Sequence, residues 1–247
     1  MLFELLPVID TMLALYGMPR TPARFEAYLK ILQGDTRGDL VLPVSGFNPM
    51  AREHVPDQLQ ELQQLDAEEI IGQTCRELNE KLQNLPESNF RMALNLADDL
   101  HGGWTNRFTT NYDSKFKLSA LINRKFCTPF FWSGEAFSRS LIRHRALEAG
   151  YRTAYRLSHP QPVTLGDHIR QERFVALQTG GKTGKFTEDF SKLETFYREH
   201  QDDTDYHLIF NFLYGDDASA SLGFRCYGIR PAFAGFGFAE STRNQTE

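Results

Sequence analysis

The chain has 247 residues, of which 41% are hydrophobic and 13% aromatic, and this apolar share excludes a disordered or fibrous protein. Its net charge of −5, with no recognisable nucleic-acid-binding module, argues against a nucleic-acid partner. Length alone allows one domain or two. Because no repeat, low-complexity tract or linker is visible, we expect a single globular domain over residues 1–247, with a polar tail from about residue 240.

The first eighteen residues are apolar, and we expect a helix to about Tyr16. A secretory leader is not expected, because Glu4 and Asp10 interrupt the stretch and it holds no Lys or Arg. No later stretch has the run of uncharged apolar residues that a membrane span needs. The three cysteines form no CxxC motif, which is typical of a reducing compartment. The sequence therefore predicts a cytoplasmic protein with no membrane partner.

Helices are also expected in the next eighty residues. A Thr-Pro pair predicts a helix over residues 21–33, and residues 34–56, rich in proline and glycine, predict an extended loop. One long amphipathic helix is predicted over residues 57–85. Its narrow apolar stripe consists of Ile71, Cys75, Leu78, Leu82 and Leu85. Such a stripe is typical of a helix that packs along a core, although it also suits a homo-oligomer.

The composition then changes toward strands. Residues 91–96 alternate loosely, and residues 104–112 are rich in Thr and aromatics, so a hairpin or a strand–loop–strand is predicted over 89–113. Further helices are predicted at 134–157, 164–179, 187–200 and 204–214, and a strand near 224–229. The predicted fold class is mainly α, an α+β arrangement whose minor β component lies near 89–113 and 222–229.

Charge is distributed unevenly along the chain. Residues 101–185 hold fourteen Lys and Arg against five Asp and Glu, a balance of +9, whereas the segments on either side are acidic. Two interpretations remain open. The basic segment could face the acidic ones within one fold, or it could present a positive pocket to a small anionic ligand.

The first candidate site is the segment after the predicted strand at 91–96. Asp98, Asp99 and His101 are candidate catalytic residues, and Asp98 and His101 could hold a divalent metal ion. Arg107 and Tyr112 are candidate ligand-binding residues, with Arg107 as a clamp for an anion. The alternative is an ordinary turn in which Arg107 only pairs with Asp99.

A second candidate lies on the predicted helix at 134–157. His144 has Glu148 one turn later, a spacing found in helical metal sites, and Arg145 beside it is a candidate ligand-binding residue. A lone histidine on an apolar face is more often a hydrogen-bonded core residue. The acidic and histidine-rich residues 199–207 are interpreted as helix capping through Asp203 or Thr204.

The glycine-lysine stretch at 179–186 does not match a phosphate-binding P-loop and is interpreted as a basic surface loop, which could act as a lid over an anionic ligand. Two functions from different classes follow from these candidates. The favoured one is an enzyme or small-molecule binder whose pocket lies around the 98–113 loop and the 134–157 helix. It would be metal-dependent or would bind an anionic ligand. The other is a non-catalytic interaction or homo-oligomerising protein that uses the helix at 57–85.

Overall fold

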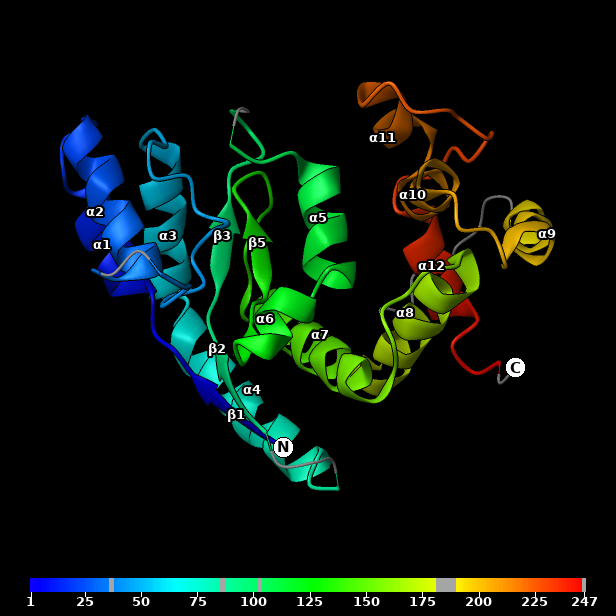
Figure 1. The fold of residues 1–247 in the computed structure, drawn as a ribbon, viewed down its shortest axis with the longest axis horizontal. Helices are drawn as coiled ribbons and strands as arrows, with labels where there is room; N and C mark the ends of the chain where they lie inside the picture. Colours follow the sequence, from blue (N-terminus) through cyan, green and yellow to red (C-terminus); the bar gives the residue numbers. More distant parts are fainter. Residues whose placement is uncertain (36–37, 85–87, 102–103, 181–189, 246–247) are drawn as a thin grey trace. The chain divides into compact units, whose positions relative to one another are not determined.

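The computed structural model describes residues 1–35, 38–84, 88–101, 104–180 and 190–245, and it forms two compact units, Met1–Ala154 and Tyr155–Glu247. Most of the described chain is helical, with small parallel sheets (Figure 1). This confirms the predicted fold class, mainly α with a minor β component. The single domain stays a prediction, because two compact units can fold together or separately.

The first unit combines helices with short strands. Its strands are β1 (Leu2–Leu5), β2 (Asn89–Met92), β3 (Asn95–Ala97), β4 (Phe126–Cys127) and β5 (Phe130–Trp132). Its helices are α1 (Ile9–Tyr16), α2 (Pro22–Gln33), α3 (His54–Gln64), α4 (Ala67–Lys81), α5 (Arg107–Phe116), α6 (Ser119–Asn123) and most of α7 (Arg139–Ser158). In Figure 1, α1, α2 and α3 lie on one side of β3 and β5, and α5 lies on the other.

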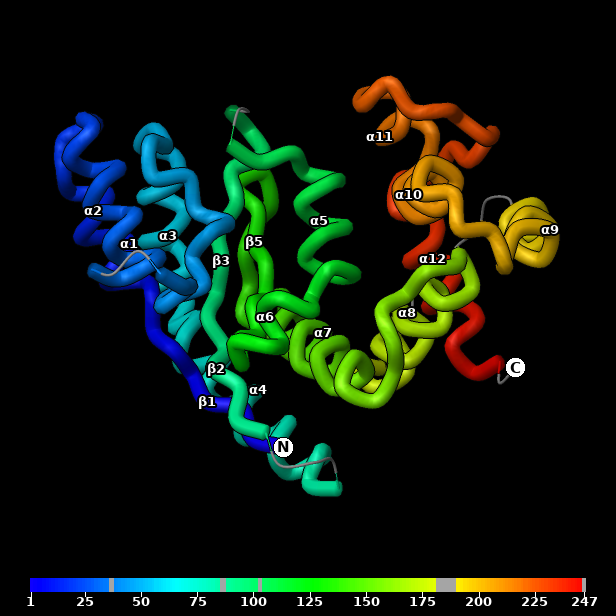
Figure 2. Tube along the Cα trace, viewed as in Figure 1, coloured from blue at the N-terminus to red at the C-terminus, as the bar shows by residue number. Residues whose placement is uncertain are grey.

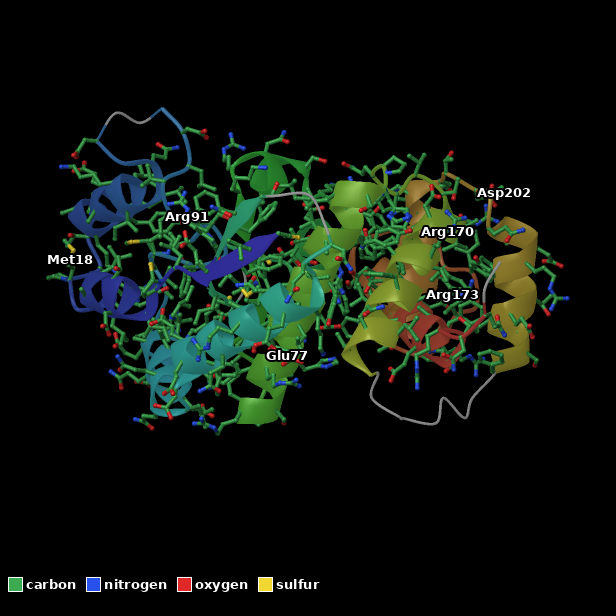
Figure 3. The ribbon with its side chains drawn as sticks, turned by 90° about the horizontal axis from the view of Figure 1, so that it is seen from below. Met18, Glu77, Arg91, Arg170, Arg173 and Asp202 are labelled. Atoms are coloured by element: carbon green, nitrogen blue, oxygen red, sulfur yellow. The ribbon has the colours of Figure 1, made fainter. Side chains whose placement is uncertain are left out.

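All the strand pairs described in this unit are parallel. One sheet has the order β1-β2-β4, and β3 pairs with β5. Backbone bonds from the Ala93 N–H to the Cys127 carbonyl and from the Asn95 N–H to the Pro129 carbonyl continue the pairing between the two sheets. Residues 89–97 and 126–132 therefore lie side by side, as the Cα trace in Figure 2 shows. The Arg91 guanidinium on β2, labelled in Figure 3, lies 4.5 Å from the centre of the Phe126 ring on the neighbouring strand.

Two predicted elements near this sheet are wrong. The first predicted strand is confirmed by β2 and β3, but the hairpin over 89–113 does not form, because residues 89–97 pair with a segment some thirty-five residues later and residues 107–116 form helix α5. The Asn106 side chain accepts the backbone N–H groups of Phe108 and Thr109 and so caps α5. The predicted N-terminal helix is also wrong at its start, since β1 pairs with β2 and only residues 9–16 are helical.

The predicted long helix at 57–85 is two helices. α3 ends at Gln64, and α4 begins at Ala67 after Asp66, whose φ of 57° lies in the left-handed region and breaks the helical path. Three residues of the apolar stripe, Ile71, Cys75 and Leu78, pack inward and are each at most 2% exposed, whereas Leu82 is half-buried and Leu85 lies outside the described residues. The three buried residues are part of the core of the first unit, where α4 contacts β1.

The second unit contains the last residues of α7 and a set of shorter helices. These are α8 (Leu165–Thr179), α9 (Phe190–His200), α10 (Tyr206–Tyr214), α11 (Asp216–Ser221) and α12 (Ala234–Ser241). A capping box between Thr164 and Asp167 starts α8. Arg173 of α8, labelled in Figure 3, donates to the Thr242 hydroxyl at 2.8 Å. The predicted strand near 222–229 is wrong, because residues 222–229 have no strand pairing and pass between α11 and α12 through turns and bends.

Within the ranges given above, no helix is long and apolar enough to cross a membrane.

Candidate functional site at the carboxyl ends of the strands

Asp98 and Ser133 occupy matching places in the parallel sheet. Asp98 follows β3 directly, and Ser133 follows β5. Since β3 and β5 run parallel, both residues lie at the carboxyl ends of their strands, where open α/β sheets bind ligands. The Ser133 hydroxyl donates to Asp98 Oδ1 at 2.9 Å, and the backbone N–H groups of Leu100 and His101 donate to the same oxygen at 3.1 and 3.3 Å.

Two histidines lie beside Asp98. His54, the first residue of α3, places Nε2 2.9 Å from Asp98 Oδ1. The contact is as short as a hydrogen bond, but the two groups are not aligned as a hydrogen bond requires. The two side chains therefore interact mainly through the attraction between the Asp98 carboxylate and a protonated His54 ring. The His101 ring lies edge-on to the His54 ring, with 4.6 Å between ring centres. The fold therefore brings together two histidines and one carboxylate.

Asp98 is held as a carboxylate. Its side chain is only 3% exposed, and burial alone would raise its pKa. Interactions with His54, Ser133 and the backbone N–H groups of His101 and Leu100 outweigh burial and hold the pKa below the ordinary 3.8. Asp98 is thus charged near neutral pH and presents a negative charge to the neighbouring imidazole of His54.

An open hollow with about 740 Å³ of space, including solvent, adjoins these groups. Its polar lining consists of Arg20, Asn48, Arg52, His54, Asp98 and His101. Arg20 donates to the Met50 carbonyl at 3.0 Å, which fixes one of the two guanidinium groups beside the histidines. The hollow therefore combines groups that can transfer protons with cations that can bind an anionic substrate.

Asp99 and Arg107 form an ion pair of their own. Arg107 Nη1 lies 2.6 Å from Asp99 Oδ2, and its guanidinium lies 4.5 Å from the centre of the Trp132 ring. Asp99 also accepts the Gly134 N–H at 2.7 Å. A Cβ at position 134 would come within 3.1 Å of that carboxylate, so glycine permits the close approach. This arrangement matches the alternative in which Arg107 pairs with Asp99, and neither residue lines the hollow.

The other predicted ligand-binding residues lie elsewhere in the first unit. Tyr112 is buried on α5, with its ring centre 5.0 Å from that of Phe116. His144 Nε2 is 3.9 Å from Glu148 on the same helix. Arg145 donates to the Phe130 carbonyl and to Glu135, both at 3.0 Å. The structure thus brings Asp98 and His101 together and separates them from Tyr112, His144 and Arg145.

His54 is the site residue that sequence reasoning missed. It lies forty-four positions before Asp98 and inside a segment interpreted as a loop, and no local pattern joins the two. Arg20 and Arg52 were missed for the same reason. A parallel pairing of 89–97 with 126–132 would have placed Asp98 at a strand end, but not beside α3.

The described part of the chain contains no group of three or more His, Cys, Asp or Glu side chains arranged to hold a metal ion. A metal ion on Asp98 and His101 therefore gains no support from the geometry and stays a prediction.

The other predicted segments have separate outcomes. Residues 102–103 of the predicted turn, and residues 181–186 of the predicted basic loop, lie outside the described residues. In the 199–207 segment, Asp205 rather than Asp203 or Thr204 caps the following helix, because its side chain accepts the His207 N–H at 3.0 Å.

Comparisons with protein families, with curated proteins and with solved structures found no match to this chain.

Proposed function

We propose that this protein is an enzyme that activates water against a small anionic substrate in the hollow lined by His54, Asp98, His101, Arg20 and Arg52. The observation that carries the proposal is the contact between His54 and the buried, charged Asp98 at the carboxyl ends of the strands. A histidine beside a charged carboxylate is a common general base, and such a base contributes about 10²- to 10⁴-fold to a rate.

His54 is the residue that moves the proton. Its Nε2 faces Asp98, which leaves Nδ1 to accept a proton from a water molecule. The proton charges the ring, and the Asp98 carboxylate stabilises that charge. Arg20 and Arg52 neutralise the substrate, an anionic ester. As the water oxygen bonds to the ester centre, the bond to the leaving group breaks, and His101, whose ring centre lies 4.6 Å from that of His54, supplies the proton that the leaving group takes.

A serine nucleophile is not part of this proposal. The Ser133 hydroxyl donates to Asp98 at 2.9 Å and also lies 3.2 Å from an Asp99 oxygen. A serine of a catalytic triad instead donates to the histidine. Ser133 therefore positions the carboxylate, and water is the nucleophile that fits the arrangement.

The test is turnover of three p-nitrophenyl esters, the phosphate and the sulfate as anionic substrates and the acetate as a neutral one. We expect the wild-type protein to prefer an anionic ester, and His54→Gln to lower kcat by about 100-fold or more. Arg52→Gln should raise KM more than it lowers kcat, because Arg52 binds charge that is present in the ground state.

His200→Gln is the matched control, since His200 also contacts an aspartate but lies in the other unit. It should leave kcat unchanged. Absence of turnover of either anionic ester by the wild-type protein, or equal activity of His54→Gln, would contradict the proposal.

The alternative function, an interaction protein that uses the helix at 57–85, gains no support from the described residues. Ile71, Cys75 and Leu78 of its apolar stripe are buried within the first unit rather than presented to a partner.

A further inference from the structure

A second cavity in the first unit is separate from the hollow. It lies among α5, α6, α7 and the segment that joins β4 to β5, and it contains about 490 Å³ of space, with solvent at its mouth included. Its polar and charged lining consists of Asn111, Ser114, Lys115, Thr128, Arg145, Glu148, Arg152 and Thr153. It shares no lining residue with the hollow.

Cations outnumber anions in this lining. Lys115, Arg145 and Arg152 stand against the single carboxylate of Glu148. The Arg152 side chain is only 5% exposed, and its Nη2 lies 3.9 Å from Glu148 Oε1. Arg145 Nε also lies 3.9 Å from Glu148, while its terminal nitrogens bind Glu135 and the Phe130 carbonyl. The field in the cavity is therefore positive even with Glu148 ionised.

Glu148 is ionised throughout the ordinary pH range. Burial would raise its pKa, but Lys115, Arg152, Arg145 and His144 together lower it to about 2. The same cations, Lys115, Arg145 and Arg152, line the space beside Glu148, so they would stabilise the negative charge of a ligand as well.

Thr128 gives an independent sign of a ligand. The residue is 8% exposed, it lines the cavity, and its hydroxyl makes no hydrogen bond within the described part of the chain. A buried hydroxyl without a partner destabilises the fold, so natural proteins seldom leave one. The hydroxyl becomes satisfied if a polar ligand occupies the cavity.

The cavity is suited to binding rather than covalent catalysis. Its cysteine, Cys127, is 2% exposed, and burial raises its pKa to about 12, so it stays a thiol. The Thr153 hydroxyl lies 3.4 Å from the Cys127 sulfur and donates to the Ala149 carbonyl, so it is already satisfied.

We infer that this cavity binds a small tetrahedral oxyanion, a phosphate group, against Lys115, Arg152 and the Thr128 hydroxyl. Lysine and arginine supply the charge, and the threonine hydroxyl supplies a donor to one oxyanion oxygen. The phosphate can be the free ion or the terminal group of a larger ligand that extends through the open mouth.

The test is titration calorimetry of the full chain at low ionic strength, because salt weakens binding between charges. The probes are inorganic phosphate and phenyl phosphate. All titrations use the Arg20→Gln/Arg52→Gln background, so that phosphate bound in the hollow does not contribute. We expect Lys115→Gln to weaken phosphate about tenfold and Thr128→Val about fivefold, since each removes one interaction of the oxyanion.

Lys117→Gln is the matched control. Lys117 lies two residues after Lys115, directly after the end of α5, and it pairs with Asp113 outside the cavity. It should not change the affinity. Tighter binding of phenyl phosphate than of phosphate would assign the site to a phosphate ester, and the reverse to the free ion.

Thr128→Val keeps the shape of the side chain, so it separates binding from folding. We expect its melting temperature to equal or exceed that of the wild-type protein, since it removes an unpartnered hydroxyl. No detectable binding of either probe, or affinities that Lys115→Gln and Thr128→Val leave unchanged, would overturn the inference. These outcomes are independent of turnover in the hollow.

Discussion

The two units each contain a histidine–aspartate contact, and the contacts differ in almost everything except chemistry. In the first unit His54 lies 2.9 Å from Asp98, forty-four residues later, and the Asp98 side chain is 3% exposed. In the second unit His200 lies 2.6 Å from Asp203, three residues later, and the Asp203 side chain is 47% exposed. The shorter contact is the local and exposed one.

The comparison shows that distance alone does not identify a site. The His200–Asp203 contact lies at the end of α9, where exposed pairs contribute little because water competes for both partners. Asp98 instead accepts bonds from a serine and two backbone N–H groups, and it faces a hollow. Burial and the number of donors, which only the tertiary fold provides, distinguish the two aspartates.

The two contacts should differ most in the free energy of unfolding that is lost when the aspartate is replaced. Asp98→Ala should lower the free energy of unfolding of the first unit by about 2 to 4 kcal/mol, because several buried donors lose their acceptor. Asp203→Ala should change that of the second unit by no more than about 0.5 kcal/mol. Equal losses of unfolding free energy in the two variants would mean that Asp98 stabilises its unit no more than Asp203 does.

Urea unfolding can follow the units separately. Both tryptophans, Trp104 and Trp132, belong to the first unit, so their fluorescence reports on it. Far-UV circular dichroism follows the helices of both units. Unfolding curves that coincide for the two signals would indicate that the units unfold together, as the predicted single domain requires.

Replacing the histidines should give a smaller difference in stability between the two contacts. His54→Gln should lower the stability of the first unit by about 1 kcal/mol, since it removes one of the partners of a buried carboxylate while the others remain. His200→Gln should have an effect below about 0.5 kcal/mol. The same urea experiments measure both changes, and a larger loss for His200→Gln would reverse the expected order.

Local sequence patterns predicted the helices better than the sheet. Periodicity and capping residues located α2, α8 and α10 closely, because a helix satisfies its own backbone. The sheet depends on partners far away in the sequence, so the strand character of residues 2–5 and 126–132 was not visible locally. The Thr- and aromatic-rich segment 104–112 is predicted as a strand, but helix α5 begins within it at Arg107, and the Asn106 cap was a usable signal.

The same limit applies to the candidate site. Asp98 and His101 were predicted because they are neighbours in the sequence, and the fold keeps them together. His54, Arg20 and Arg52 join them only through the packing of the helices against the strands. Arg107 was predicted as an anion clamp, but a local pattern could not decide between a ligand and Asp99 as its partner.

The smallest expected effect is the pH dependence that Asp98 contributes. Because the pKa of Asp98 is lower in the folded protein than its ordinary 3.8, the unfolded chain binds more protons in this range. Its contribution to stability is therefore complete above pH 3.8 and is lost as the pH falls through the folded pKa.

Asp98→Asn has no carboxylate to protonate, so its unfolding free energy should decline less steeply than that of the wild-type protein as the pH falls below about 4. Tryptophan fluorescence in urea at a series of pH values measures both slopes. Taking the difference between the two proteins removes the contributions of other carboxylates with lowered pKa values, such as Glu148 in the same unit. Parallel slopes would mean that the contacts around Asp98 favour its neutral and charged forms equally, and the contrast with Asp203 would then rest on burial alone.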